Sequence, residues 1–250
     1  MRKIIAVGIV CLVGLMVMAG ATAQEQVGGK KVRILLVTGG HGFEEAKFFK
    51  MFDDLKGFEC RKAAYPQAAE LIKPGLEKEC DAIVMYDMVK SITPDQQKAF
   101  VELLNSGIGL VCLHHDLGAH DDWAEFTKIR GGKYFHKPMT IDGKDYAKST
   151  YAHDQDMKVT VVDKEQPITK GLQDFVIHDE AYGGCYVSPS VKVLLKTDHP
   201  KSTPELAWVN NYGKSKVFYL MLGHDSKAWA NPAFIELLSR GIRWTVGKEQ

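Results

Sequence analysis

The chain has 250 residues, of which 45% are hydrophobic and 25% are charged, a balance typical of a soluble globular protein. A formal net charge of +1 provides no electrostatic basis for binding nucleic acid or an anionic membrane surface, so we expect neither as a partner. After the first residues, no linker, repeat or low-complexity stretch divides the chain. The sequence therefore predicts one domain over residues 32–247.

Residues 1–23 have the features of a secretory signal peptide. Arg2 and Lys3 form a basic start, residues 4–20 are almost wholly apolar, and residues 21–23 (Ala-Thr-Ala) form a small-residue cleavage site. The apolar run is at the short limit for a membrane span, and no basic stop-transfer cluster follows it. We therefore expect cleavage, export of the mature protein to the periplasm, and no membrane contact afterwards.

The cysteines follow no metal-binding pattern. Cys11 leaves with the signal peptide, and the spacing of Cys60, Cys80, Cys112 and Cys185 matches no Cys-x-x-Cys motif. An exported protein can form disulfides, but the sequence does not select a pair. Cys112 lies in an apolar strand pattern, which indicates a small buried side chain.

Strands and helices are predicted to alternate in the first half of the chain. Continuous apolar runs indicate strands buried on both faces, and apolar residues at helical spacing indicate the helices between them. This order predicts an α/β, flavodoxin-like three-layer sandwich with a mainly parallel sheet. The predicted elements are a strand at Val32–Thr38, a helix at Phe43–Leu55, a strand at Phe58–Ala64, a short helix at Ala68–Leu76, a strand at Asp81–Met88, a helix from the N-cap Thr93 with Pro94 and Gln96 to Gly107, and a strand at Ile108–Leu113.

The second half is less regular. The stretch Gly131–Tyr151 is polar and rich in Lys and Gly, which predicts an excursion over the surface. The other predicted elements are a helix at Asp121–Ile129, short strands at Lys158–Val162, Phe175–His178 and Val191–Thr197, a hairpin of Ala207–Asn211 and Val217–Leu222, and a last helix with Asn231 as N-cap and Pro232 in its first turn.

Histidine-bearing turns follow three of the predicted strands. They carry Gly40 and His41 after the first strand, His114-His115-Asp116 after the fourth, and Gly223-His224-Asp225 after the last; a fourth group, His178 to Tyr182, includes Glu180. Each turn alone is more typical of a loop or a helix cap. Parallel strands would bring the turns together at the edge where such folds bind ligands, which favours a functional site.

The chain resembles the ThuA-like (trehalose-utilisation) family of the class I glutamine-amidotransferase-like superfamily. The stretches that carry the resemblance span nearly all of residues 32–247. They are "ILLVTGGHGFEE", "GLVCLHHDLGAHDDWAEF" with "GGKYFHKP", "QPITKGLQDFVIHDEAY", "PELAWVNNYGKSKVFYLMLGHD" and "WANPAFIELLSRGIRW".

The resemblance implies that thiol chemistry has been lost. In the amidotransferase fold a nucleophilic Cys occupies the turn after a central strand, and a His follows a later strand. His114 takes the first position here and His224 the second, while Cys112 is two residues too early. Cys185 follows Gly183-Gly184, and nothing in the sequence brings it near His224. Because the thioester route needs a thiolate at the turn, we expect no glutamine amidotransferase activity.

Two chemistries remain open for these residues. His41, His114 and His224 could hold a divalent metal such as zinc. Alternatively, His114 or His224 could work with Glu180 or Asp225 as metal-free acid–base catalysts.

The resemblance implies a small-molecule carbohydrate as the partner, notably a disaccharide or 3-keto sugar. We expect that ligand to contact six residues near the turns, where the two aromatic side chains could stack on sugar rings. The six are Gly40, His41, His115, Asp116, Tyr182 and Trp229.

Two functions are consistent with these features. The first is an exported enzyme, a hydrolase, lyase or isomerase acting on keto-sugars, which the set of histidine and acidic residues favours. The second is a non-catalytic carbohydrate- or partner-binding domain on an amidotransferase-like scaffold, which the missing nucleophile favours.

Overall fold

The computed structural model describes Met1 and residues 30–248. Apart from Met1, the predicted signal peptide lies outside the described residues. Within residues 30–248, nine strands form one sheet in the order β2-β1-β3-β4-β13-β12-β11-β8-β9. None of the helices in this part of the chain has the length and hydropathy needed to cross a membrane.

The first half of the sheet is parallel, as the alternating pattern predicts. Each strand pairs in parallel with its neighbour, and β13 from the end of the chain continues the series beside β4. The carboxyl ends of all five strands therefore meet at one edge. The five are β1 (Val32–Gly39), β2 (Phe58–Ala64), β3 (Ala82–Asp87), β4 (Gly109–Leu113) and β13 (Ser215–Leu220).

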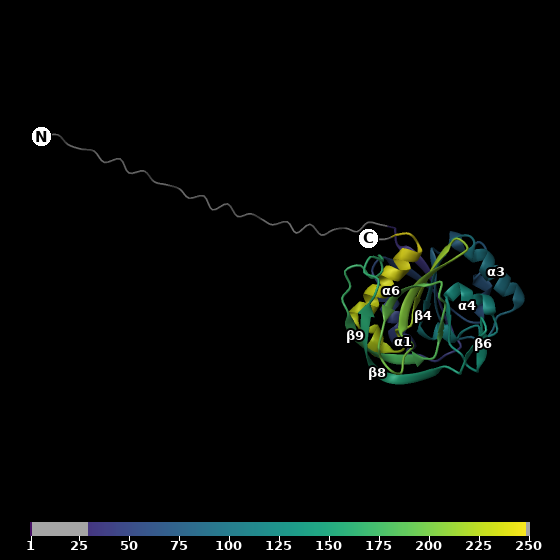
Figure 1. Ribbon diagram of the computed structural model, residues 1–250. Helices are drawn as coiled ribbons and strands as arrows, with labels where there is room; N and C mark the ends of the chain where they lie inside the picture. Colours follow the sequence, from purple (N-terminus) through teal and green to yellow (C-terminus); the bar gives the residue numbers. More distant parts are fainter. Residues whose placement is uncertain (2–29, 249–250) are drawn as a thin grey trace.

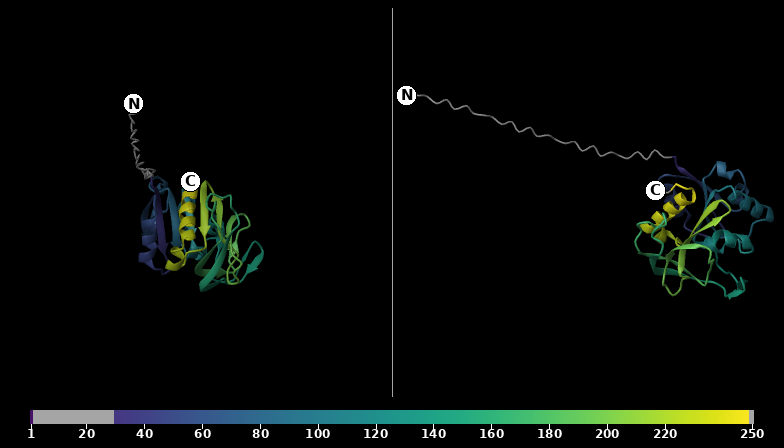
Figure 2. Two further views of the ribbon diagram at one scale, coloured as in Figure 1. Left: turned by 90° about the vertical axis from the view of Figure 1, so that its left-hand side faces the viewer. Right: turned by 45° about the horizontal axis from the view of Figure 1, so that its top comes forward.

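Helices cover both faces of this parallel region. In Figure 1, α1 and α6 lie on one side of β4, and α3 and α4 lie on the other. Figure 2 shows the C-terminal helix α6, in yellow, and this helix packs against β13, β4 and β3. The helices are α1 (Glu45–Asp54), α2 (Gln67–Leu71), α3 (Pro94–Leu104), α4 (Ala124–Arg130), α5 (Ser226–Trp229) and α6 (Pro232–Thr245), with short 3₁₀ turns η1 (Leu76–Lys78) and η2 (His114–Gly118).

The predicted caps of two helices are present. Thr93 accepts a hydrogen bond from the backbone N–H of Gln96, whose side chain accepts one from the N–H of Thr93, so a capping box starts α3. Asn231 accepts one from Ala233 at the start of α6.

The second half of the sheet is antiparallel, and its β8–β9 pair extends beyond the sequence prediction. β8 has twelve residues, of which Thr160 and Val161 pair with β11, while positions 150–159 pair with β9. This pair thus reaches away from the sheet as an arm. The strands are β8 (Thr150–Val161), β9 (Phe175–Gly183), β11 (Lys192–Lys196) and β12 (Glu205–Tyr212).

The segment predicted as a surface excursion is partly buried. Tyr134 and Phe135 are buried, because this stretch passes under the β8–β9 arm, where the N–H of Phe135 donates a hydrogen bond to Oγ of Ser149. The polar composition of this segment therefore does not predict its buried, structured part. The segment forms β5 (Gly132–Lys133), which pairs with β10 (Tyr186–Val187), and a hairpin of β6 (Met139–Ile141) and β7 (Lys144–Tyr146).

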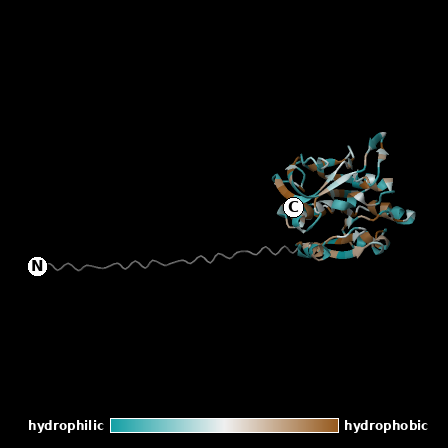
Figure 3. Ribbon diagram, turned by 90° about the horizontal axis from the view of Figure 1, so that it is seen from below, coloured by the Kyte–Doolittle hydropathy of each residue, from teal (hydrophilic) through white to brown (hydrophobic). Residues whose placement is uncertain are grey.

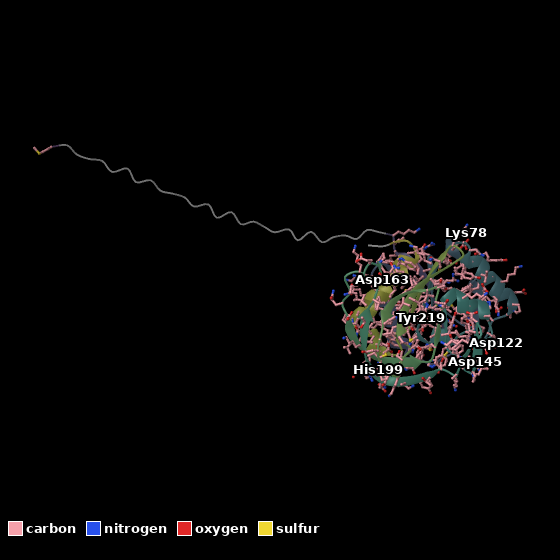
Figure 4. The ribbon with its side chains drawn as sticks, viewed as in Figure 1. Lys78, Asp122, Asp145, Asp163, His199 and Tyr219 are labelled. Carbon is pink, nitrogen blue, oxygen red and sulfur yellow. The ribbon has the colours of Figure 1, made fainter. Side chains whose placement is uncertain are left out.

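The core lies between the sheet and its covering helices. Along the helices hydrophobic and hydrophilic residues alternate (Figure 3), as expected where one face is buried. Tyr219 of β13 lies in the middle of the molecule, and labelled polar residues such as His199 lie at its periphery (Figure 4). Cys112 is fully buried, as its apolar surroundings predict, and all four cysteines of the described chain are free.

Candidate active site

The three histidine-bearing turns meet at the carboxyl edge of the parallel strands. β1 leads to His41, β4 leads directly into His114, and β13 leads to His224. His114 has a φ of 47°, a left-handed conformation that is uncommon outside glycine. The Tyr219 hydroxyl donates to the backbone carbonyl of His114 at 2.8 Å and holds this strained turn from below.

A backbone carbonyl fixes the orientation of the His114 ring. Nδ1 of His114 lies 2.6 Å from the oxygen of Met221. A carbonyl can only accept, so Nδ1 carries a proton and donates it. In the neutral ring Nε2 therefore carries a lone pair, and this nitrogen lies 3.0 Å from the Tyr182 hydroxyl.

Glu180 and His224 complete a triangle with His114 Nε2. Glu180 Oε2 lies 3.0 Å from His114 Nε2 and 3.1 Å from His224 Nδ1, and the two nitrogens are 3.2 Å apart. His114 and Glu180 are buried, and His224 is partly exposed. Three ligand atoms thus face one point from three different elements.

The donor set fits a catalytic divalent ion. Two imidazoles and a carboxylate are typical zinc ligands, and zinc bonds of about 2.0–2.1 Å place neighbouring tetrahedral ligands about 3.3–3.4 Å apart. The three atoms are almost at that spacing. The carbonyl behind His114 fixes the ring nitrogen that a metal would use, as is usual for metal-binding histidines.

Charges around the triangle are strongly coupled. Burial raises the pKa of Glu180, but hydrogen bonds with His114 and His224 outweigh burial and hold the pKa well below its usual range. The hydrogen bond with Glu180 raises the pKa of His224. Burial lowers the pKa of His41, and that of His115 further, so both rings are neutral at pH 7.

A second carboxylate holds the turn that carries His224. Both oxygens of the buried Asp179 accept backbone N–H groups, at 2.7 Å from Gly223 and 2.9 Å from His224. Asp179 also accepts from the N–H of Glu180 at 2.8 Å. One side chain of β9 therefore fixes two of the three triangle residues.

A cavity of about 320 Å³ lies beside the triangle, and Glu180 is the triangle residue that lines it. Three tyrosines, Tyr134, Tyr151 and Tyr182, provide aromatic surface in its wall. Its histidines are His41, His115, His136 and His153. The volume suits a small organic ligand.

Two of these histidines each commit one ring nitrogen to a backbone carbonyl. His115 donates from Nδ1 to the carbonyl of Asp87 at 3.2 Å, and His136 donates from Nε2 to the carbonyl of Gly118 at 2.9 Å. The opposite nitrogen of each neutral ring is then an acceptor. Nε2 of His115 is buried and has no partner among the described residues.

His41 lies beside the triangle. Its ring centroid is 4.7 Å from that of His115, and it lines the cavity. The group of donor atoms within 4.8 Å of one another consists of His114, Glu180 and His224. Glu180 thus occupies the place in the metal set that the sequence prediction gave to His41.

The structure places three other predicted site residues away from the cavity. Asp225 is the N-cap of α5 and accepts from the N–H groups of Lys227 and Ala228. Asp116 is fully buried and paired with Arg130 at 3.2 Å. Trp229, predicted as a platform for sugar rings, is buried against Phe48 and Tyr86, and its indole N–H donates to Gly223.

Gly40 has a backbone role at the rim. Its φ is +77°, and a Cβ atom there would lie 2.5 Å from the carbonyl carbon of Met88. A glycine is needed because the turn of His41 passes directly over the end of β3.

Sequence reasoning missed His153, Tyr134 and His136. Nδ1 of His153 contacts Glu180 Oε1 at 3.1 Å from the opposite strand β8. Tyr134 and His136 belong to the segment predicted as a surface excursion. Neither strand periodicity nor a spaced motif marks these residues as part of a site. Tyr134 and His136 lie in the stretch "GGKYFHKP", which contributes to the family resemblance without giving them a role.

Cysteine chemistry is absent from the triangle. Burial raises the pKa of the Cys112 thiol well above its usual range, and this side chain lies inside β4. Burial raises the pKa of Cys185 to about 11, and Cys185 lines a different cavity, of about 630 Å³. Neither thiol is a ready nucleophile.

Comparisons with known proteins agree with this architecture. A solved ThuA-like protein from Parabacteroides merdae matches with a TM-score of 0.74 and 20% identity, over 88% of this chain and 92% of that one. A cytoplasmic protein from Salmonella typhimurium matches with a TM-score of 0.57 and 13% identity, over 86% and 99%. At these identities the likeness shows the fold alone.

A larger enzyme contains a similar domain. The cold-adapted β-galactosidase from Rahnella sp. R3 matches 85% of this chain with 31% of its own length, at a TM-score of 0.55 and 12% identity. A search of curated proteins finds no match. The sequence model of the ThuA family, described as trehalose utilisation, matches residues 33–245. The chain therefore belongs to the ThuA family and has the class I glutamine-amidotransferase-like fold.

Proposed function

We propose that this protein is an exported enzyme of disaccharide or 3-keto-sugar metabolism with a divalent metal centre at His114, Glu180 and His224. The observation that carries the proposal is the triangle of ligand atoms, with sides of 3.0, 3.1 and 3.2 Å, whose member Glu180 lines a cavity. Three electron-pair donors this close, one of them an ionised carboxylate, need a cation or a proton between them.

The cavity wall supports a carbohydrate as the ligand. His115 and His136 each commit one nitrogen to a protein carbonyl and present the other as an acceptor. Acceptors suit the O–H groups of a polyol, and the tyrosines provide flat surfaces for sugar rings. The family description, trehalose utilisation, is consistent with this ligand class.

His41 and Tyr182 can take separate roles in a reaction that removes a proton from the carbon next to a sugar ketone. A divalent ion, when bound, would polarise the ketone oxygen and make the neighbouring C–H acidic. His41 is neutral at pH 7 because burial lowers its pKa, so it can accept that proton. The Tyr182 hydroxyl, beside the triangle, can return a proton to an oxygen atom. Lyase and isomerase chemistry both begin with this abstraction.

The metal centre is tested by comparing metal-free and zinc-loaded protein. We expect the mature protein to bind one zinc ion per chain and to convert a 3-keto-disaccharide only when it is loaded. His114→Asn, Glu180→Gln and His224→Ala should each weaken zinc binding at least about 10-fold. Asn is chosen at position 114 because it tolerates the positive φ.

His199→Gln is the matched control, because His199 lies at the periphery (Figure 4) and is not among the residues that line the cavity. It should bind zinc like the wild type. Turnover by metal-free protein would assign the site to metal-free acid–base catalysis. Sugar binding without turnover in either form would instead identify a binding domain.

Export is tested separately. Mass spectrometry of the protein recovered from the periplasm of an expressing bacterium should give a chain that begins at Gln24. An intact N-terminus in the cytoplasm would contradict export and leave the site unaffected.

A further inference from the structure

β8 contains one extra residue opposite the glutamate of the triangle. Ala152 pairs with Ala181, and the next pair is Gln155 with Asp179. His153 and Asp154 of β8 therefore lie opposite Glu180 alone. Two residues facing one define a β-bulge, a feature that redirects side chains and is frequent beside active sites.

The bulge directs His153 onto the free oxygen of Glu180. Nδ1 of His153 lies 3.1 Å from Oε1, whereas Oε2 faces His114 and His224. The His153 ring also packs against that of His224, with centroids 4.9 Å apart. One carboxylate oxygen is thus held from outside the triangle while the other remains available inside it.

A surface ion pair connects the bulge to the turn of His224. Asp154 has a φ of 54°, and its Oδ1 accepts from Lys227 Nζ at 2.7 Å and lies 3.1 Å from His178 Nε2. Lys227 belongs to α5, which starts directly after His224 and Asp225. The contact therefore spans two walls of the site.

We propose that His153 is a positioning residue for Glu180 and that the Asp154–Lys227 ion pair keeps the bulge in register with the His224 turn. The inference rests on the proposed metal centre. Hydrogen bonds to a metal-binding side chain typically change metal affinity by about 10- to 100-fold. Without the bulge, residues 150–153 would move to the opposite face of the strand, because side chains alternate with a period of two.

Zinc affinity, measured by competition with a chromogenic chelator, tests the role of His153. His153→Phe should weaken binding about 10-fold or more, because Phe cannot donate to Oε1. His153→Gln should restore most of the affinity, because its amide can donate to the same oxygen. The thermal unfolding midpoints of both variants should equal that of the wild type, since the His153 side chain is 54% exposed.

Two substitutions of Asp154 test the ion pair. Asp154→Gly removes the carboxylate and tolerates the positive φ, and Asp154→Ala removes the carboxylate and strains the backbone. We expect a two- to fivefold loss of zinc affinity, on the order of a surface ion pair, for Gly and a larger loss for Ala. Asp54→Asn, which breaks the exposed pair with Lys50 on α1, is the control and should have no effect.

The outcomes separate the two proposals. If the wild type binds no zinc, the metal centre is wrong and the role of His153 falls with it. If the wild type binds zinc and His153→Phe binds it equally well, the metal centre stands and the positioning role is overturned. Equal affinities of wild type and Asp154→Ala would overturn the role of the ion pair.

Discussion

Nε2 of His115 is the most enclosed acceptor in the cavity wall. The side chain is 2% exposed, and its Nδ1–H is committed to the carbonyl of Asp87. Its ring packs on those of Tyr86 and His41, with centroids 4.1 and 4.7 Å away. A buried acceptor without a protein partner is satisfied when a ligand hydroxyl donates to it.

Replacing His115 by Phe should therefore weaken sugar binding and leave zinc binding intact. Phe keeps the ring contacts and removes the acceptor, so we expect a loss of about 1 kcal/mol, or about fivefold in affinity. Calorimetric titration of the zinc-loaded variant with a 3-keto-disaccharide measures this. Equal dissociation constants for variant and wild type would show that no hydroxyl reaches Nε2.

His120 is a second buried histidine, below the site. Neither ring nitrogen has a hydrogen-bond partner among the described residues, and the ring packs against Trp123 and Phe126. Burial lowers its pKa from 6.5 to about 3. The folded protein thus keeps this ring neutral between pH 6.5 and 3, where the unfolded chain protonates it.

The contribution of His120 to the free energy of unfolding should fall as the pH falls from 6.5 towards 3. The unfolded state binds more protons in this window, so stability rises with pH, by up to about 1.4 kcal/mol per pH unit. His120→Asn removes the titration and tolerates the φ of 54°. Urea unfolding at pH 4 to 7 measures the free energy of unfolding of the wild type and of the variant. The difference between the two free energies should change with pH.

The carboxyls of Asp87 and Asp116 have the opposite effect on the pH dependence of the free energy of unfolding, because burial raises the pKa of each. The contribution of Asp116 is common to wild type and variant, so it cancels in the difference. Asp87 Oδ2 lies 3.7 Å from His120 Nε2, so a change in the pKa of Asp87 adds to that difference. Parallel stability curves would show that His120 does not remain neutral.

Among the elements, β9 fixes the active-site geometry through Asp179. Its carboxylate accepts backbone N–H groups of Gly223, His224 and Glu180, and so joins β9 to the turn after β13. These bonds lie in a buried region where water cannot replace them.

Asp179→Asn should destabilise the fold and weaken the metal centre together. The amide NH₂ would face N–H donors, which leaves buried groups unsatisfied and costs about 2–3 kcal/mol. Chemical denaturation and zinc titration of the same preparation measure both effects. Asp225→Asn is the control, because Asn is an equally good N-cap for α5 and should change neither quantity greatly.

The elements also show what a single sequence can predict. Each strand and helix of the first half has one clear hydrophobic period, and caps mark the helix ends. These signals define the alternation of strands and helices and place His114 and His224 at the ends of parallel strands. β8 is largely exposed and contains a bulge, so its pattern breaks near His153. Its pairing with β9 is long-range, and this pairing, which no local pattern encodes, brings His153 onto Glu180.

In the whole molecule, the triangle joins two parts of the sheet. His114 and His224 come from the parallel region, and Glu180 comes from β9, the last strand in the sheet order. β8 pairs with β11 through Thr160 and Val161, so most of the β8–β9 arm depends on other contacts. A metal ion at the triangle would tie this arm to the parallel core.

Metal removal should therefore loosen the arm selectively. A ligand at 100 times its dissociation constant stabilises the bound form by about 2.7 kcal/mol, which slows opening-limited amide exchange about 100-fold. We expect zinc to protect positions 150–159 and 175–183 and the turn of His224, and to leave β1 and β2 unchanged. Hydrogen-exchange mass spectrometry of the metal-free and loaded protein tests this, with Glu180→Gln as the control that abolishes the difference. Equal protection across the whole chain would mean that the ion stabilises the fold globally, and no protection would mean that it does not connect β9 to the core.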